Sequence, residues 1–473
     1  PVQARVRAGM GTPVPGVPRR DAGGFKEANK GQHFSPTNPK LGLRPCWTRG
    51  GPRAPGEFMD SKRARFAIFL TVFVDLLGFG IVIPILPLYA KAIAAHPSPW
   101  MDGVNHALRL LEPGAFWAGL AFVSFSLMQF LASPLLGRIS DMAGRKPVLW
   151  ISLLGTAASY VIMAGTGRYE WVLAARILAG VLGGNIPVAQ AAMADSSAPE
   201  ERSKALGMIG AAFGLGFVIG PALAGVLSGS AAGARLHAEH GWHLPFLVAA
   251  GLSLLASLMV LLWVPETLSP EVRQRARTEE SRGHALQLAL ARPGMPQVLG
   301  ISLLSMSGFA MMEGTFALLA EHRFDFHQRE VGYLFGLVGI LIVLYQGGLV
   351  RLVARHIPER LALIAGLGLM LVALPLLPVA PWAAPFLVTF IPLAWGSGMS
   401  NTASQALASQ LTPPEDQGGL FGVLNAVSGI GRIVGPLVGT FAFARWGFAS
   451  PYWLATGTVG LALLLALTLP RRP

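Results

Sequence analysis

The sequence contains little cysteine and little charge. Cys46 is the single cysteine among 473 residues, which excludes an intrachain disulfide and a cysteine-rich zinc site. Only 13% of the residues are charged, whereas an ordinary soluble domain has about 25%. The sequence also lacks a HExxH zinc motif, a GxxxxGKS/T phosphate loop and a nucleophile–base pattern. We therefore expect neither an enzyme nor an ATPase, and we expect no metal and no cofactor.

The formal net charge of +13 does not indicate a nucleic-acid partner. The basic residues lie in short loops between apolar blocks, and no basic surface with interleaved aromatic residues is present for a nucleic acid to follow. Apolar residues make up 52% of the chain and recur in long blocks from Phe66 to Leu469. Most of the chain is therefore expected to lie in lipid.

The apolar blocks have the length of membrane-spanning helices, which need about 20 mostly apolar residues. The predicted fold class is an all-α membrane protein with two pseudo-symmetric halves of six spans. The twelve predicted spans are 66–90, 115–136, 148–166, 171–194, 204–228, 244–264, 297–320, 331–350, 360–378, 384–411, 419–443 and 451–469.

Residues 1–58 differ from the rest of the chain in composition. They contain ten Gly, nine Pro and ten Lys or Arg, and they have no apolar run that could form a signal-peptide core. Such a segment cannot bury enough apolar surface to fold. We predict a disordered basic extension that is dispensable, or that precedes a translation start at Met59.

The distribution of Lys and Arg between the spans predicts the orientation. With the Met59 end in the cytoplasm, the inside segments hold 18 Lys or Arg and the outside loops hold 7. Because inside loops are enriched in Lys and Arg, we expect both termini in the cytoplasm, and the inner membrane as the location if the source is bacterial. We also expect a monomer in contact with membrane lipid.

The chain is predicted to consist of two related halves, 59–264 and 297–473, joined by a charged cytoplasmic linker at 265–296. At a constant offset of 215, Gly207, Gly214, Gly216, Gly220 and Pro221 match Gly422, Gly429, Gly431, Gly435 and Pro436. Duplicated halves are common in secondary transporters, and the substrate site lies between them near the middle of the membrane.

Two segments carry a family resemblance. The loop 137–147 after the second span reads GRISDMAGRKP and resembles the signature loop of the major facilitator superfamily. The matching residues are Gly137, Asp141, Gly144, Arg145 and Lys146. Asp141 and Arg145 in this loop would bridge neighbouring helix ends and act as a gate. The alternative is that the basic residues of the loop only set the topology, because cytoplasmic loops are enriched in Lys and Arg.

The fifth span resembles the motif of proton-coupled antiporters through Gly216, Gly220, Pro221 and Gly225, with Ala224 where the family has a glycine. The segments from Gly184 to Gln190 and from Asp75 to Gly80 resemble the tetracycline-efflux-like drug:proton antiporters. The resemblance implies a secondary transporter driven by a proton gradient. A purely structural role in close packing explains these glycines equally well, because small residues let membrane helices approach each other.

Four charged residues lie well inside the predicted spans, away from their ends. Asp75 is about 14 Å deep in the first span at about 1.5 Å per residue, where a charge needs a partner or a water-filled cavity. Arg176 in the fourth span is the expected partner, in a buried pair that either couples to transport or is only structural. Asp75, Arg176 and Glu313 form the predicted proton-coupling set.

Glu313 in the seventh span has no Lys or Arg close to it in the sequence. A carboxyl group without a counter-ion in a low-dielectric environment is easier to protonate, so Glu313 is the predicted proton carrier, or alternatively only a hydrogen-bonding group between helices. Arg432 in the eleventh span stands where the first half has Phe217. It either binds an anionic group of the substrate or pairs with Glu313.

Uncharged polar residues in the spans are candidates for the substrate cavity, because polar groups in spans tend to face the interior. Each of them either contacts substrate or only ties helices together. With Arg432, the candidates are Gln129, Asn185, Gln190, Asn401 and Gln405.

Three functions remain open. The first is a proton-coupled antiporter that exports a lipophilic or amphipathic small molecule, such as a tetracycline-like drug. The second is a facilitator or proton symporter for a polar metabolite such as a sugar or an organic anion. The third is a membrane sensor or scaffold that transports nothing, which the charged loop and the buried charges argue against.

Overall fold

The computed structural model describes residues 55–198, 201–228, 243–268, 290–413 and 417–469. Within these ranges every regular element is helical and no strand occurs, which confirms the predicted all-α class. Most of the predicted extension 1–58 and of the predicted linker 265–296 lies outside the described residues. The exact limits of the two halves therefore stay predictions.

The helices follow the predicted spans closely. In the first half they are α1 (Pro55–Ile93), α2 (Pro99–Leu108), α3 (Pro113–Ala143), α4 (Arg145–Gly165), α5 (Tyr169–Leu182), α6 (Ile186–Asp195), α7 (Arg202–Ser228) and α9 (His243–Trp263). In the second half they are α12 (Met295–Phe324), α13 (Gln328–Leu344), the π-turn η2 (Tyr345–Leu349), α14 (Val350–His356), α15 (Glu359–Val379), α16 (Ala383–Val388), α17 (Phe390–Gln410), α18 (Gln417–Trp446) and α19 (Ser450–Thr468).

Among the described residues, eleven helical segments are long and apolar enough to cross a membrane. The span predicted at 331–350 is helical but is not one continuous α-helix. It is built from α13, which has 17 residues, the π-turn η2 and α14. The π-turn falls on Gly347 and Gly348, and glycine has a low helix propensity. This is the one predicted span that is not among the eleven candidates.

Two other spans contain a break. The span Tyr169–Asp195 is divided into α5 and α6 by residues 183–185. Gly183 and Gly184 weaken the helix there, and Pro187 in the first turn of α6 has no N–H to donate to the preceding turn. The span Ala383–Gln410 is likewise divided into α16 and α17 at Thr389.

Helix α2 lies in a segment that the sequence analysis left as a loop. It docks on the first half through polar contacts at both of its ends. Ser98 Oγ and Trp100 Nε1 donate hydrogen bonds to Glu170 Oε1, and Asn105 Oδ1 accepts one from the indole of the buried Trp117. Its short length and its dependence on these partners explain why hydropathy alone does not reveal it.

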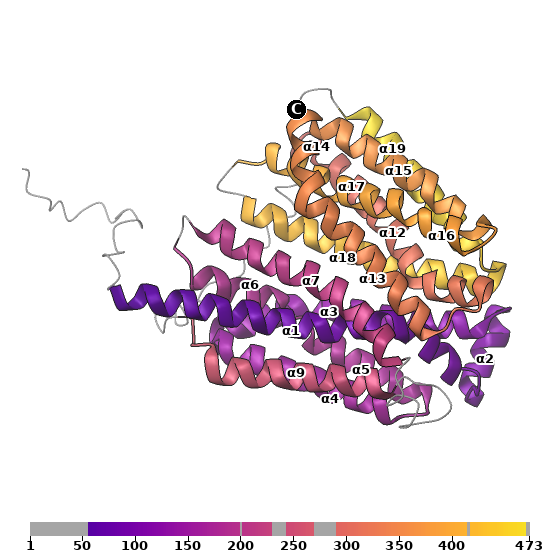
Figure 1. Cartoon of the computed structure of the whole chain (residues 1–473), viewed down its shortest axis with the longest axis horizontal. Coiled ribbons are helices and arrows are strands. Elements are labelled where there is room, and N and C mark those ends of the chain that lie inside the picture. Colours follow the sequence, from indigo (N-terminus) through magenta and orange to yellow (C-terminus); the bar gives the residue numbers. More distant parts are fainter. Residues whose placement is uncertain (1–54, 199–200, 229–242, 269–289, 414–416, 470–473) are drawn as a thin grey trace, which may run out of the picture. The chain divides into compact units, whose positions relative to one another are not determined.

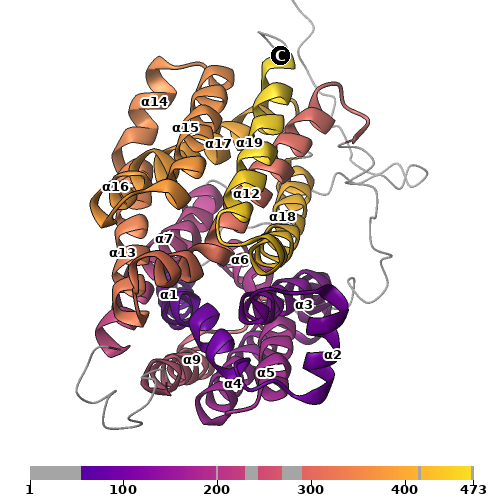
Figure 2. The same cartoon turned by 90° about the vertical axis from the view of Figure 1, so that its right-hand side faces the viewer.

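Each half is held together by its own helix pairs. In the first half α1 packs on α7 and α9, and α4 packs on α9; in the second half α12 packs on α18 and α19, and α15 packs on α17. The halves meet where α3 packs on α18 and α7 packs on α13. In Figure 1 the first half runs from indigo to magenta and the second from orange to yellow, and Figure 2 shows the same helices from the side.

The two ends of the bundle differ. We call the end with Lys91, Glu321 and Ala444 the gate end, and the end with Asp141 and Arg145 the loop end. Exposed tryptophans gather near the gate end, as expected where a helix leaves the hydrocarbon core for the headgroup region. They are Trp100, Trp171, Trp382, Trp446 and Trp453, whereas the exposed Trp263 ends α9 at the loop end.

The orientation of these ends in the membrane can be tested by labelling. From the Lys and Arg distribution we expect the loop end and the linker to face the cytoplasm. In a Cys46→Ser background, a cysteine at Met142 should react with an impermeant maleimide only after the membrane is opened, and a cysteine at His106 should react in intact cells. The reverse pattern would show that the predicted orientation is wrong.

Candidate functional site

The halves are in direct contact at the gate end. Lys91 Nζ lies 2.7 Å from Glu321 Oε2, which joins the end of α1 to the end of α12. The backbone N–H groups of Leu111 and Glu112 both donate to Ala444 O, at 2.7 and 3.0 Å. The ion pair is partly exposed, with 36% and 35% of the two side chains accessible, so it contributes only about 0–1 kcal/mol. The contacts to Ala444 join the backbones of the two halves directly.

Glycines allow the helices of the two halves to touch near this end. A methyl group at Gly332 of α13 would lie 2.5 Å from Gly225 N of α7, and one at Gly339 would lie 2.8 Å from Val218 Cα. On the other side of the interface, Gly119 of α3 lies directly against Thr440 of α18. We call the contact of Gly225 and Val218 with Gly332 and Gly339 the glycine seam. At this seam the backbones approach too closely for any side chain.

The same helices separate toward the loop end. Gly214 of α7 still has Val343 within 3.9 Å of its methyl position. One and two turns closer to the loop end, Gly210 and Gly207 have no described atom within 4 Å, and neither does the equivalent Gly422 of α18. The described halves therefore close at the gate end and diverge at the loop end.

The predicted antiporter motif uses two faces of α7. Gly216 and Gly220 face α1, where methyl groups on them would lie 2.8 Å from Leu76 Cβ and 2.7 Å from Gly80 Cα. Gly225 and the carbonyl of Pro221 face α13 of the other half at the glycine seam. The motif thus fixes α7 to its own half while it presents a flat surface to the second half. Its role in antiport stays a prediction.

The signature loop forms a tight polar cluster. Gly144 joins α3 to α4 with φ 110 and ψ 157, a conformation that side-chain-bearing residues rarely adopt. Arg145 Nη1 lies 2.5 Å from Asp141 Oδ1 and donates to Ser140 Oγ at 2.6 Å, and its Nε lies 3.2 Å from Asp195 Oδ2. Arg145 therefore joins α3, α4 and α6.

An acid that follows the end of α9 completes this cluster. Glu266 accepts hydrogen bonds from the backbone N–H groups of Arg145 and Lys146, at 3.0 and 3.3 Å. A carboxylate at the start of α4 satisfies free N–H groups and interacts favourably with the helix dipole. At the same end Arg65 Nη1 lies 2.5 Å from Glu201, and this guanidinium keeps the pKa of the Glu201 carboxyl below its usual range.

All these partners belong to the first half. The cluster bridges the ends of α3, α4 and α6, and the contacts given above all lie within the first half. This agrees with the separation of the halves at the loop end. No described atom lies within 4 Å of a methyl group placed on Gly137.

We expect Asp141→Asn to slow turnover about two- to fivefold while substrate affinity stays unchanged, because the cluster shapes a helix junction far from the glycine seam. Rates and dissociation constants should be measured in proteoliposomes. Met142→Gln, on an exposed neighbour, serves as the control. A changed dissociation constant at an unchanged rate would contradict the prediction.

Asp75 and Arg176 do not form the predicted ion pair. Arg176 is 2% exposed, its Nε donates to Ala121 O at 3.1 Å, and its guanidinium lies 4.4 Å from the centre of the Phe125 ring. Its Nη1 has no hydrogen-bond partner among the described residues. Asp75 instead has Ser253 of α9 as its polar neighbour. The reason is the direction of α1, since Gly78, one turn further, faces Ala249 of α9.

Tyr160 of α4 connects the two groups indirectly. It is 2% exposed and lies within electrostatic reach of both Asp75 and Arg176. The three side chains come from α1, α4 and α5, which all belong to the first half. Sequence reasoning missed Tyr160, because a tyrosine in an apolar span has no feature that distinguishes it from packing residues.

Glu313 and Arg432 are the charged pair of the second half. Arg432 of α18 is exposed and Glu313 of α12 is partly buried. The positive charge of Arg432 interacts electrostatically with Glu313. The two do not approach within the 4.0 Å of a salt bridge in the part of the chain that is described. Gly429, one turn before Arg432, faces the Phe130 ring of α3 at 3.2 Å from its methyl position. Arg432 therefore lies on the side of α18 that is turned to the first half.

The predicted cavity residues divide into two groups. Gln129 donates to Gly183 O at 2.9 Å and Asn185 is only 4% exposed, so both stabilise the break between α5 and α6. Gln190 is partly buried. Asn401 and Gln405 are exposed, and Gln405 Nε2 donates to Asn401 Oδ1 at 2.7 Å. The second half thus presents most of the exposed polar candidates.

An aromatic cluster in the first half was not predicted. The Phe79 ring lies 5.3 Å from Phe125 and 6.0 Å from Phe217, and Phe213 continues the row at 6.5 Å from Phe217. The cluster joins α1, α3 and α7, and Phe125 carries the guanidinium of Arg176 on its face. Apolar aromatic surface thus adjoins a buried cation.

An all-helical, multi-pass bundle with charges inside its spans and with only one end closed defines the class of membrane transporters. The family model of the Major Facilitator Superfamily matches residues 68–390 and 349–473, and the chain belongs to this superfamily. It is an integral membrane protein that resembles the tetracycline-efflux-like transporters, and it is not an enzyme.

Relatives and solved structures agree with this assignment. The bovine major facilitator superfamily domain-containing protein 10 is 28% identical over 457 residues, which cover 88% of this chain and 94% of the relative. The class C tetracycline resistance protein of Escherichia coli is 30% identical over 416 residues, which cover 86% and 96%. The crystal structure of the human organic anion transporter MFSD10 (TETRAN) has a TM-score of 0.63 at 25% identity and covers 86% of this chain and 99% of that chain.

Proposed function

We propose that this transporter is a proton-coupled antiporter that exports an amphipathic small molecule, and that an anionic group of this molecule binds Arg432. The observation that carries the proposal is the arrangement of Glu313 and Arg432, a carboxyl group and an exposed guanidinium that influence each other without forming a salt bridge. A charge inside a span is costly and is retained where it has a function.

This arrangement supports exchange by competition. When Glu313 is ionised, Arg432 is its nearest counter-charge. When an anionic substrate occupies Arg432, Glu313 loses that counter-charge and is more stable with a proton. Protonation of Glu313 and release of substrate would then alternate. Closure at the gate end and separation at the loop end supply the other requirement, which is access from one side at a time.

The relatives support both parts of the proposal. Tetracycline resistance proteins and an organic anion transporter are among the similar proteins. The aromatic cluster of Phe79, Phe125 and Phe217 offers apolar surface in the opposite half. An amphipathic anion has an apolar part for such rings and a charged group for Arg432.

A symporter or facilitator for a polar organic anion is the second candidate. It is favoured by Arg176, whose Nη1 has no partner among the described residues, because this donor together with Arg432 would suit a small dianion. The antiporter is preferred because Arg176 is buried beneath Phe125 inside the first half, so a substrate between the halves meets Arg432 first. A sensor that transports nothing is less favoured, because it has no need for a carboxyl group and a guanidinium group inside the spans.

Purified protein in proteoliposomes with an imposed pH gradient tests the proposal. Tetracyclines, amphipathic organic anions and small polar anions should be screened in parallel. We expect uptake of an amphipathic anion against its gradient, together with proton movement in the opposite direction. Movement of protons in the same direction as the substrate would support the second candidate, and no movement of any class would support a sensor.

A further inference from the structure

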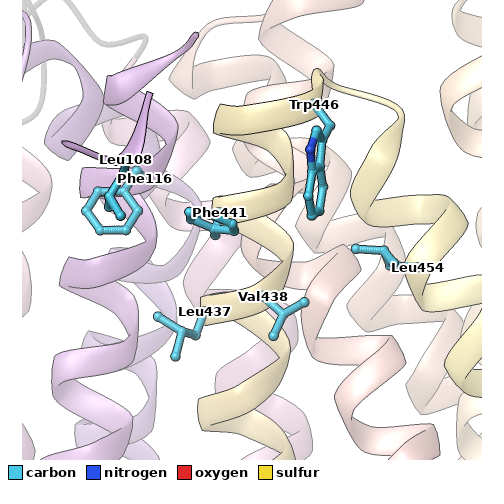
Figure 3. A pocket seen from close by; sticks show the side chains of 7 residues that line it. All are labelled: Leu108, Phe116, Leu437, Val438, Phe441, Trp446 and Leu454. Carbon is cyan, nitrogen blue, oxygen red and sulfur yellow. The ribbon is translucent and has the colours of Figure 1, made fainter. Parts of the chain in front are cut away.

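A groove at the gate end lies outside the site described above. It encloses about 460 Å³ and is lined only by apolar side chains of α2, α3, α18 and α19, a volume within the ~300–1,000 Å³ of small-molecule sites. Figure 3 shows Leu108 and Phe116 on one side, Leu454 on the other, and Phe441 and Trp446 between them. The lining residues are Leu108, Phe116, Leu437, Val438, Phe441, Trp446 and Leu454.

The groove opens on the lipid-facing surface. Apart from Leu108 of α2, its walls belong to the membrane-spanning helices Pro113–Ala143, Gly422–Trp446 and Ser450–Thr468. Leu437, Trp446 and Leu454 are 41%, 61% and 38% exposed. Apolar side chains exposed at this level of a spanning helix contact acyl chains, and Trp446 marks the interface with the headgroups. The groove is therefore open to the lipid of the membrane.

Two arginines belong to the backbone segments that meet beside the groove, where Leu111 and Glu112 donate to Ala444 O. Arg109 follows Leu108 directly and Arg445 precedes Trp446 directly, so each lies next to a lining residue. Neither forms a salt bridge among the described residues, although Glu112 lies three positions from Arg109. Guanidinium groups bind phosphate oxygens in pairs of hydrogen bonds. Apolar walls with two cations at one end match the chemistry of an anionic phospholipid.

The groove also depends on contact between the halves. Leu108 and Phe116 belong to the first half, and the other lining residues belong to the second. The hydrogen bonds from Leu111 and Glu112 to Ala444 O hold these walls together beside the groove. When the halves separate at the gate end, the two walls part and the groove is lost.

We propose that this groove binds one acyl chain of an anionic phospholipid, that Arg109 and Arg445 hold its phosphate, and that the bound lipid favours the state closed at the gate end. A ligand that binds only one conformation shifts the equilibrium toward it. The proposal does not depend on the identity of the substrate or on proton coupling.

Photolabelling of the full chain in nanodiscs tests the proposal. Phosphatidylglycerol and phosphatidylcholine, each with a diazirine near the end of one acyl chain, are compared, and the adducts are mapped by mass spectrometry. We expect phosphatidylglycerol to label Leu437, Phe441 and Leu454 in preference to phosphatidylcholine. Arg109→Gln and Arg445→Gln should each reduce this preference about fivefold, and the double variant about 30-fold.

Controls separate the groove from the general lipid belt. Arg329→Gln removes an exposed arginine at the same end and should leave the preference unchanged. Val438→Trp fills the groove and should abolish labelling of Leu454, while labelling of the exposed Leu255 and Leu258 on α9 persists and reports a folded protein. Equal labelling by both lipids, insensitivity to both arginines, or adducts spread evenly between α9 and the groove would overturn the proposal.

Discussion

Glu313→Gln is expected to abolish accumulation of substrate driven by a pH gradient and to leave downhill exchange measurable. One pH unit corresponds to about 1.4 kcal/mol per proton, or up to about tenfold accumulation when one proton is exchanged. The amide keeps the size of the side chain but cannot take up a proton. Substrate should still bind and cross, and it should stop at equal concentrations on both sides.

The measurement is uptake into proteoliposomes with and without an imposed gradient, with counterflow as the assay for downhill exchange. Glu321→Gln is the matched control, because it removes a carboxylate of the same helix that lies at the gate end in an exposed ion pair. It should retain accumulation. Persistent tenfold accumulation by Glu313→Gln would rule out this residue as the coupling site.

Asp75→Asn has a milder expected effect in this structure than it would have if Asp75 and Arg176 formed the predicted ion pair. If Asp75 neutralised Arg176, its loss would leave a buried cation unpaired, which is strongly destabilising. In the structure Arg176 is held by Ala121 O and the Phe125 ring. We therefore expect Asp75→Asn to fold and to bind substrate.

Gly332→Val is expected to prevent closure at the gate end. Its first side-chain carbon would lie 2.5 Å from Gly225 N and 2.8 Å from Pro221 O, and neither backbone can move without displacing α7. Overpacking of this kind costs about 1–3 kcal/mol, which shifts an equilibrium between two states by roughly 5- to 150-fold. Transport should fall by a similar factor while the protein remains folded.

A cysteine at Thr440 reports this change. Thr440 is 1% exposed and lies against Gly119 of the other half, so it reacts with a thiol reagent only when the gate end separates. Gly332→Val should accelerate its labelling. The control is Gly368→Val in α15, where no described atom lies within 4 Å of the new carbon. If the Gly332→Val protein transported normally and Thr440→Cys stayed unreactive toward the thiol reagent, closure would not need close approach of α7 and α13 at the glycine seam.

The membrane-spanning helices could be predicted from the sequence because lipid imposes one simple requirement along the chain. Twenty apolar residues in succession leave few alternatives, and the limits of α4, α7 and α9 agree with the prediction within a few residues. The π-turn at Tyr345–Leu349 and helix α2 could not be predicted, since both depend on neighbours. Tyr345 packs against Gly398 of α17, and α2 is held by Glu170.

The charged sites show the same limit. Depth along a helix follows from counting residues, and it places Asp75 and Arg176 correctly inside the membrane. The direction in which a side chain points around the helix axis does not follow from counting. Asp75 is directed to α9 and Arg176 to α3, so two charges at suitable depths remain apart. Glu313 and Arg432, by contrast, lie on helices that pack together, and their proximity had been considered as an alternative from the sequence.

The glycine seam has a further consequence for the energy of each cycle. A side chain that is immobilised at an interface loses rotamer freedom, up to about 2 kcal/mol for the long flexible residues and nothing for glycine. At Gly225, Gly332 and Gly339 the contact consists of backbone that is already ordered within α7 and α13. The seam can therefore form and separate in every cycle with almost no loss of conformational entropy, and few side chains need to rearrange before the halves come together again.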